Sequence, residues 1–191
     1  MRLIIVDGLD CVGKDTHAQL IKKRYEEKGE KVLVRSHPEF DNFFGKRAKK
    51  ALLGKGKINK LKASVFYALD VLRSIEKYYV RGDYDTLIMV RYLMGTAYLS
   101  PWLAKIAYLF FEIFVPTSDY MFFLDAAPEV LFERVANRKE KEMFESPGEL
   151  VKVRKTALSL ARNWVVIDTS GSIESTFACI HNTLDKLDGK R

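Results

Sequence analysis

The stretch RLIIVDGLDCVGKDTH, residues 2–17, decides the fold. It opens with a short apolar run rich in β-branched side chains, which predicts a buried strand of a parallel sheet. A short loop with a glycine at each end follows, and the chain then continues with helical spacing until Gly29. A strand, a glycine-bounded loop and a helix in this order are the context that a phosphate-binding loop requires.

Gly8 and Gly13 give the loop this character, because they let the backbone bend so that successive N–H groups surround phosphate oxygens. The helix that starts near Lys14 directs the positive end of its dipole to the same place. Lys14 adds a mobile positive charge for the β- and γ-phosphates. The alternative is a chance strand–turn–helix with a surface lysine. The predicted ATP-binding residues are Gly8, Cys11, Val12, Gly13, Lys14, Asp15 and Thr16.

One position departs from the usual pattern G-x-x-x-x-G-K-[ST], since Asp15 stands where a serine or threonine is expected. The usual hydroxyl binds Mg²⁺ directly while staying neutral towards the phosphates. A carboxylate is a better ligand for a hard cation, but without the metal it repels the triphosphate. Thr16 keeps a hydroxyl one position later. We predict Mg²⁺ as the cofactor, with Asp15 and Thr16 as its candidate ligands.

Outward from this loop, apolar strand-like runs alternate with helical segments. Four further strands are predicted, over residues 31–37, 86–92, 119–126 and 164–170. A long helix is predicted over residues 62–82. Strands that alternate with helices form a parallel sheet covered on both faces, so the predicted class is an α/β three-layer sandwich with five parallel strands. A length of 191 residues without a linker or repeat predicts a single domain over residues 1–191.

Composition and charge narrow the classes of function. The net charge of +7 favours anionic ligands of any kind. The most apolar stretch, residues 92–116, is interrupted by Pro101, Lys105 and Glu112, whereas a membrane span needs about 20 nearly unbroken apolar residues. The basic run Lys46–Lys62 lacks the interleaved aromatic side chains of single-strand binders. With a short N-terminal apolar run and two separated cysteines, these features predict a cytoplasmic protein that binds neither membranes nor nucleic acid.

Longer segments carry a family resemblance that extends over nearly the whole chain. They are VDGLDCVGKDT (6–16), LDAAPEVLFERVANR (124–138), ESPGELVKVRKTALSLA (145–161) and WVVIDTSGSIESTF (164–177). Together they resemble the thymidylate kinase family of nucleoside monophosphate kinases. The resemblance implies a P-loop NTPase sandwich with a lid at about residues 136–147. It also implies transfer of the ATP γ-phosphate to a nucleoside monophosphate, with dTMP to dTDP as the first expectation.

The resemblance further implies roles for single residues. Asp10 matches a loop aspartate near the acceptor's sugar or the metal, and Tyr67 matches an aromatic side chain that stacks on the acceptor base. Arg91 and Tyr92 match the end of the family's D-R-Y motif, in which the arginine bridges phosphates. The alternatives are an ordinary core position for Tyr67 and a surface salt bridge for Arg91. The implied catalytic residues are Lys14, Arg91 and the lid residue Arg138, and the implied acceptor-binding residues are Asp10, Tyr67, Asp70, Arg91 and Tyr98.

Four positions depart from the family's pattern. Val90 stands at the aspartate of D-R-Y, and Val71 stands at an arginine that binds the acceptor's phosphate in the family. Leu99 replaces a polar residue, and Ala157 replaces a tyrosine after the lid. Arg73 lies about 200° around a helix from position 71, so it cannot simply substitute. The donor half of the pattern is therefore retained, whereas the acceptor half has changed.

Three functions remain open on these residues. The first is a thymidylate kinase, with ATP and a nucleoside monophosphate as partners. Val71 and Leu99 favour a kinase of the same fold with a different phosphorylated acceptor, and Val90 together with Asp15 favours an ATP-binding protein with little catalysis. The resemblance also suggests a homodimer, formed through the apolar helices around Trp102–Phe114.

Overall fold

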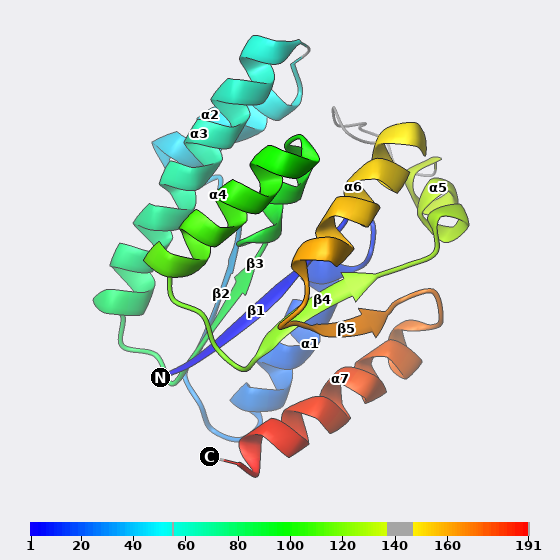
Figure 1. The fold of residues 1–191 in the computed structure, drawn as a ribbon. Helices are drawn as coiled ribbons and strands as arrows, with labels where there is room; N and C mark the ends of the chain where they lie inside the picture. The colour runs from blue at the N-terminus through cyan, green and yellow to red at the C-terminus, as the bar shows by residue number, and fades with distance from the viewer. Residues whose placement is uncertain (55, 137–146, 191) are drawn as a thin grey trace.

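A five-stranded sheet, all of whose strand pairs are parallel, forms the centre of the molecule (Figure 1). The computed structural model describes residues 1–54, 56–136 and 147–190. The strands are β1 (Arg2–Gly8), β2 (Val32–Ser36), β3 (Thr86–Val90), β4 (Met121–Asp125) and β5 (Val165–Asp168). Their order is β2-β3-β1-β4-β5, so β1 lies between β3 and β4. The loops that follow β1 and β3 therefore meet at one edge of the sheet, where ligands bind in α/β proteins.

Helices cover both faces of the sheet, which confirms the predicted α/β sandwich. In Figure 1, α1 (Lys14–Glu26) and α7 (Ile173–Asp188) lie on one face, and α3 (Lys57–Ser74), α4 (Pro101–Phe114) and α6 (Pro147–Leu160) lie on the other. Two further helices pack against these: α2 (Phe43–Leu52) on α3, and α5 (Pro128–Ala136) on α6. The remaining elements are the π-helix η1 (Ile75–Val80) and the 3₁₀ helix η2 (Met94–Tyr98).

The burial of the strands explains why they could be predicted from the sequence. Every residue of β3 and β4 is buried, and the central residues Ile4, Ile5 and Val6 of β1 are fully buried. Strands covered on both faces are continuous apolar runs, and each large apolar side chain contributes about 1.5–3 kcal/mol when it is buried. All five predicted strands are present, with ends that differ from the prediction by at most two residues.

The predicted long helix over residues 62–82 was wrong at both ends. The α-helix begins earlier, at Lys57, directly after Gly56, which adopts a φ of +91°. It ends at Ser74, and η1 continues the chain with wider turns that contain Tyr78 and Tyr79. A helical pattern in the sequence does not distinguish α-helical from π-helical hydrogen bonding, so it could not place this end.

Two further sequence predictions concern other parts of the chain. The predicted lid at about residues 136–147 falls almost entirely outside the described residues, and Arg138 lies outside them as well. The apolar stretch over residues 92–116 is divided between η2 and α4. Within the part of the chain that the structure describes, no helix has the length and apolar character needed to span a membrane.

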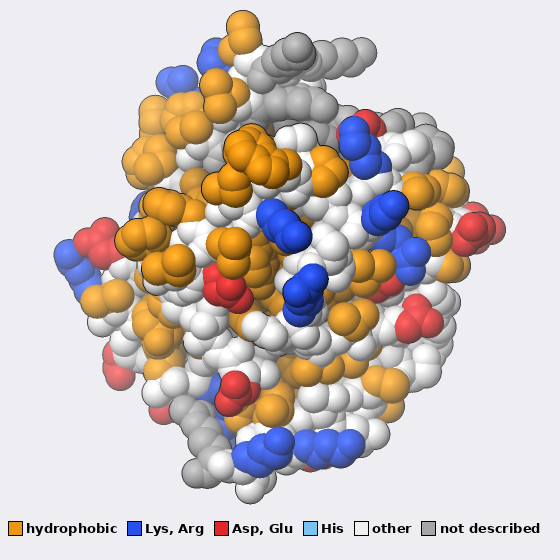
Figure 2. Space-filling view, viewed as in Figure 1, with side chains coloured by type: hydrophobic (Ala, Val, Ile, Leu, Met, Phe, Trp, Pro, Cys, Tyr) orange, Lys and Arg blue, Asp and Glu red, His pale blue; other side chains and the backbone are white. Residues whose placement is uncertain are grey.

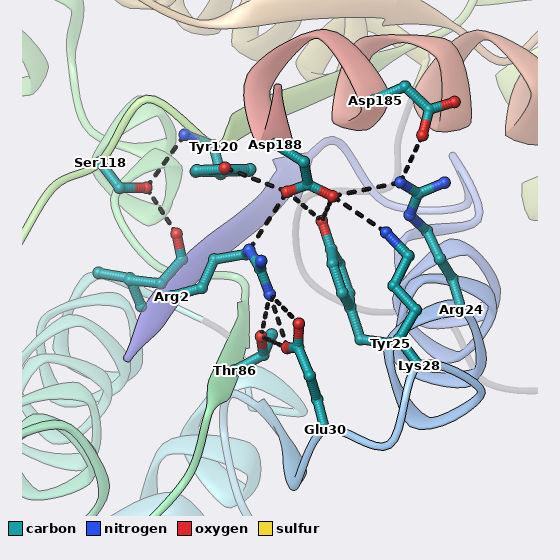
Figure 3. Close-up of polar contacts among 11 residues, drawn as sticks. Arg2, Arg24, Tyr25, Lys28, Glu30, Thr86, Ser118, Tyr120, Asp185 and Asp188 are labelled. Carbon is teal, nitrogen blue, oxygen red and sulfur yellow. Dashed lines mark hydrogen bonds and ion pairs between the residues drawn. The ribbon is translucent and has the colours of Figure 1, made fainter. Parts of the chain in front are cut away.

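A polar cluster joins the chain ends at the edge of the sheet where β1 begins (Figure 3). The carboxylate of Asp188, at the end of α7, accepts hydrogen bonds from the hydroxyls of Tyr25 and Tyr120, each at 3.1 Å. Arg24 and Arg2 approach the same carboxylate at 3.2 and 3.4 Å. The last helix is thereby attached to β1, α1 and the start of β4.

Candidate active site

A cavity of about 870 Å³ lies at the sheet edge where β1 and β3 end. It is lined by the loop after β1, the segment after β3, and parts of α2, α3, α4 and α6. The structure brings together in its wall seven predicted site residues: Gly8, Asp10, Lys14, Asp15, Tyr67, Arg91 and Tyr98. Residues from α1, α3 and the end of β3 thus face one site, although they are far apart in the sequence.

The two glycines of the loop are both required by its backbone. Gly8 has a φ of +146°, and a side chain there would overlap the carbonyl oxygen of Leu124 in β4. Gly13 has a φ of +82° and directly precedes α1. Cys11 also adopts a left-handed φ of +63°. These left-handed conformations let the chain turn from the end of β1 into the start of α1 within a short loop, as the phosphate-binding pattern predicts.

Lys14 is buried at the base of the loop. Its ammonium group donates a hydrogen bond to the carbonyl oxygen of Leu9 and lies 3.8 Å from the carboxylate of Asp10. Burial, and then the positive charge of Arg91, lower the pKa of Lys14. An anion in the cavity would offset both effects, so the site favours a phosphate near Lys14.

Asp7, the residue before the first glycine, holds the two central loops together. Its buried carboxylate accepts hydrogen bonds from the backbone N–H groups of Gly8 at 2.9 Å, Tyr92 at 2.7 Å and Met94 at 2.9 Å. Burial raises the pKa of Asp7, although these N–H groups and Lys14 oppose it. The sequence analysis gave Asp7 no role, and its signal was a carboxylate at the end of a central apolar strand.

Asp15 and Arg91, which were predicted to serve different partners, are bound to each other. The carboxylate of Asp15 accepts two hydrogen bonds from the guanidinium of Arg91, at 2.8 and 3.1 Å. The hydroxyl of Ser36 donates to Asp15 at 2.6 Å and accepts from Arg91 at 2.7 Å. Burial alone would raise the pKa of Asp15, but the hydrogen bonds and charge of Arg91 lower it below the ordinary value. Ser36 was not predicted, since it has no motif of its own.

The predicted acceptor-side tyrosines line the cavity and bind the loops beside it. The hydroxyl of Tyr67 donates to the carbonyl oxygen of Arg91 at 2.5 Å, and the hydroxyl of Tyr98 donates to Asp10 at 2.8 Å. Burial raises the pKa of both hydroxyls well above 10, so both are neutral donors at physiological pH. The ring of Tyr67 also approaches Gly95, where an added Cβ would lie 2.9 Å from it.

Several predicted residues do not line this cavity. Asp70 is fully buried in α3, and its carboxylate accepts hydrogen bonds from the backbone of Glu39 at 2.8 Å and the side chain of Asn42 at 2.6 Å. Asp70 thus holds the segment after β2, and the described residues of the cavity wall do not include it. The described cavity wall also does not include four of the predicted loop residues, Cys11, Val12, Gly13 and Thr16.

The four departures from the family pattern fall in different environments. Val71 and Leu99 line the cavity, whereas Val90 and Ala157 are buried in the core. Arg73 is not among the described lining residues and lies 3.9 Å from Asp41. The predicted acceptor side of the cavity therefore has apolar side chains where the family pattern is polar, and Arg73 does not take the place of the family's arginine in the described cavity wall.

Three further cations contact the site or its loop, and no role was predicted for any of them. Lys49 of α2 and Lys152 of α6 line the cavity. Arg134 of α5 donates to the carbonyl oxygens of Thr169 at 2.7 Å and Cys11 at 3.3 Å, so it connects the phosphate loop with the end of β5. Sequence spacing could not identify Lys49 and Lys152, because they reach the site from different helices. Arg134 lies in the segment 124–138 that carries the family resemblance, but no role was predicted for it.

The donor set of the cavity fits Mg²⁺ that arrives with a nucleotide. Among the residues that the structure describes, no group of three or more histidine, cysteine, aspartate or glutamate side chains could hold a metal ion alone. Asp10 and Asp15 both line the cavity near Lys14. Mg²⁺ in such sites is bound by one or two carboxylates together with substrate phosphates, and Asp10 and Asp15 would hold it in this way.

Comparisons with known proteins agree with this geometry. The family model described as "Thymidylate kinase" matches residues 6–180. A probable thymidylate kinase of Archaeoglobus fulgidus is 32% identical over 176 residues, which cover 90% of this chain and 89% of the relative. A thymidylate kinase of Thermosipho melanesiensis is 29% identical, covering 96% of this chain and 98% of the relative. The solved structure of thymidylate kinase from Candida albicans has a similar fold, with a TM-score of 0.76 and 16% identity over 100% of this chain and 93% of that one. The chain belongs to the thymidylate kinase family.

Proposed function

We propose that this protein transfers the γ-phosphate of ATP to a nucleoside monophosphate, converting dTMP to dTDP. Membership of the thymidylate kinase family supports this reaction. The observation that carries it is that Lys14 of the phosphate loop and Arg91 at the end of β3 line one cavity of about 870 Å³. Phosphoryl transfer needs positioning and charge neutralisation from the protein and little covalent chemistry, and these two cations are placed for both tasks.

Each predicted residue has a part in this proposal. Lys14 and the loop Gly8–Thr16 hold the phosphates of ATP, and Arg91 bridges donor and acceptor phosphates. Tyr67 stacks on the acceptor base, with Asp10 and Tyr98 near its sugar; Asp70 supports this side through the segment that it anchors. The proposed holders of the metal are Asp15, Asp10 and Thr16. When bound, Mg²⁺ neutralises charge between the phosphates.

The rest of the architecture is part of the same proposal. We propose that residues 1–191 form one kinase domain, that residues 136–147 form its lid, and that Arg138 contributes a positive charge from it. A closed lid excludes water, which otherwise hydrolyses ATP. Neither Cys11 nor Cys179 forms a disulfide bond, which supports a location in the reducing cytoplasm.

We also propose that the protein is a homodimer. Seven apolar side chains of α4 are exposed: Trp102, Leu103, Ile106, Leu109, Phe110, Ile113 and Phe114. Figure 2 shows hydrophobic side chains gathered over α3 and α4 on the viewed face. Contiguous apolar surface of this kind marks an interaction site. Sedimentation at several concentrations is expected to show a dimer, and a strict monomer at high concentration would remove this part of the proposal.

A second candidate function has its own support. Val71 and Leu99 line the cavity at positions where the family pattern is polar, so the acceptor can differ from dTMP. An assay that couples ADP release to a visible signal, run with a panel of nucleoside monophosphates, separates the two candidates. Fastest turnover with dTMP is the expected result, and a preference for another monophosphate would select the second candidate. ATP binding without turnover on any acceptor would contradict both.

A further inference from the structure

The ion pair between Asp15 and Arg91 lies where a nucleotide must bind. Asp15 is in the first turn of α1, directly after Lys14, and Arg91 directly follows β3. The side chain of Asp15 is 55% exposed and that of Arg91 is 28% exposed, and both line the cavity. A ligand in the cavity can therefore reach both charged groups.

Arg91 is fixed at its backbone and at its guanidinium. Its backbone adopts a φ of +57°, a left-handed conformation that a long side chain rarely takes. Its N–H donates to the carbonyl oxygen of Val6 at 3.2 Å, and its own carbonyl oxygen accepts from Tyr67. At the other end, Asp15 and Ser36 bind both terminal nitrogens of the guanidinium. The pair is thus an ordered contact between the phosphate loop and the end of β3.

This contact conflicts with what the proposed reaction asks of each partner. The proposed reaction requires Arg91 to bind phosphate oxygens, and Asp15 is a candidate ligand of Mg²⁺. Phosphates that arrive without the metal meet the negative charge of Asp15 and an arginine that is already neutralised. With the metal present, the carboxylate has another cation to bind, and Arg91 becomes available to the phosphates.

We propose that Asp15 exchanges Arg91 for Mg²⁺ when ATP binds with its metal, so that the loop discriminates against metal-free ATP. In the nucleotide-free protein, Asp15 is a positioning residue that holds Arg91 across the cavity with the help of Ser36. A serine or threonine at this position is neutral and cannot form this ion pair, so the discrimination is specific to the aspartate. The inference rests on the proposed function, because it requires ATP to bind this loop.

Equilibrium binding of ATP, measured by calorimetry with Mg²⁺ and again with EDTA, tests the exchange. The wild-type protein is expected to bind ATP far more tightly with the metal than without it. Asp15→Ser is expected to raise the affinity for metal-free ATP about ten-fold, because the repulsion is removed and Arg91 is released. The ratio between the affinities with and without Mg²⁺ therefore becomes smaller in this variant.

Two variants make the result specific. Asp15→Asn removes the charge while keeping the shape, so it repeats the test if the serine variant is unstable. Asp41→Asn is the matched control, because Asp41 forms a similar 3.0 Å contact with Arg35 and is not among the described residues of the cavity wall. The control is expected to leave both affinities unchanged.

The possible failures are distinguishable. If the wild-type protein binds ATP with Mg²⁺ but both Asp15 variants leave metal-free binding unchanged or weaker, the exchange is refuted and the kinase proposal stands. If Asp41→Asn strengthens metal-free binding equally, the effect is a general one of net charge and the exchange is again refuted. If the wild-type protein binds no ATP in either condition, the proposed function fails and the exchange fails with it.

Discussion

At the scale of single residues, we propose that phosphate binding depends most on the buried ammonium group of Lys14. The substitution Lys14→Ala removes a preorganised charge contact to the ATP phosphates. Such a loss typically costs about 3–4 kcal/mol of transition-state stabilisation. We therefore predict that turnover falls at least about 100-fold, measured as kcat at saturating ATP. A melting curve close to that of the wild type shows that the fold is intact, and near-normal turnover would refute the role of the loop.

Cys11 provides a test of the loop that needs no turnover. Its thiol is partly exposed in the phosphate loop, while the thiol of Cys179 is exposed on α7. We predict that ATP with Mg²⁺ slows alkylation of Cys11 several-fold, since a bound nucleotide covers the loop. Peptide mass spectrometry after timed alkylation gives both rates in one sample, so Cys179 is the internal control. Equal rates with and without ATP would place the nucleotide elsewhere.

The sequence predicted residue types in the loop better than their partners. The glycines and Lys14 have fixed spacing within one motif, so they were found directly. The partner of Asp15 is Arg91, which is 76 residues away, and no local pattern reports such a contact. The three N–H groups bound by Asp7 were missed for the same reason, because two of them come from the segment after β3.

At the scale of elements, burial decided which predictions succeeded. Strands covered on both faces are apolar runs bounded by turn residues, so all five were found. Helical periodicity placed Asp70 on the same long helix as Tyr67 but could not show which side faces the cavity. The structure places Tyr67 in the cavity wall and commits Asp70 to the backbone of Glu39.

The attachment of α7 gives a prediction about stability. Asp188→Ala removes the carboxylate that binds Tyr25, Tyr120 and two arginines, which leaves buried donors without a partner (Figure 3). We predict a loss of about 1–3 kcal/mol in the free energy of unfolding, measured by urea denaturation. Asp185→Ala is the matched control, because Asp185 is 55% exposed and its loss is expected to cost less. An equal effect of both substitutions would contradict the central role of Asp188.

The same cluster predicts how stability depends on pH. Burial alone would raise the pKa of Asp188, but the charge of Arg2 and hydrogen bonds from Arg24, Tyr25 and Lys28 lower it below the ordinary value. A carboxyl with a lowered pKa stabilises the fold above its unfolded pKa of about 4, and the contribution is lost as pH falls through the folded value. The melting temperature of the wild type should therefore fall more steeply below about pH 4 than that of Asp188→Asn. Parallel curves would contradict this.

At the scale of the whole molecule, the strand order β2-β3-β1-β4-β5 accounts for the site. It places the phosphate loop beside the segment that carries Arg91, in one cavity that Val71 and Leu99 of the predicted acceptor side also line. The order itself was not predicted, because single strands do not specify their neighbours. The central claim is that phosphate moves between two nucleotides within this cavity.

Direct measurement of both products tests that claim. The protein is incubated with ATP, Mg²⁺ and dTMP, and ADP and dTDP are quantified together by chromatography. We predict one dTDP for every ADP, with little ADP formed when dTMP is omitted. ADP that accumulates at the same rate without dTDP, or the absence of both products, would contradict the account.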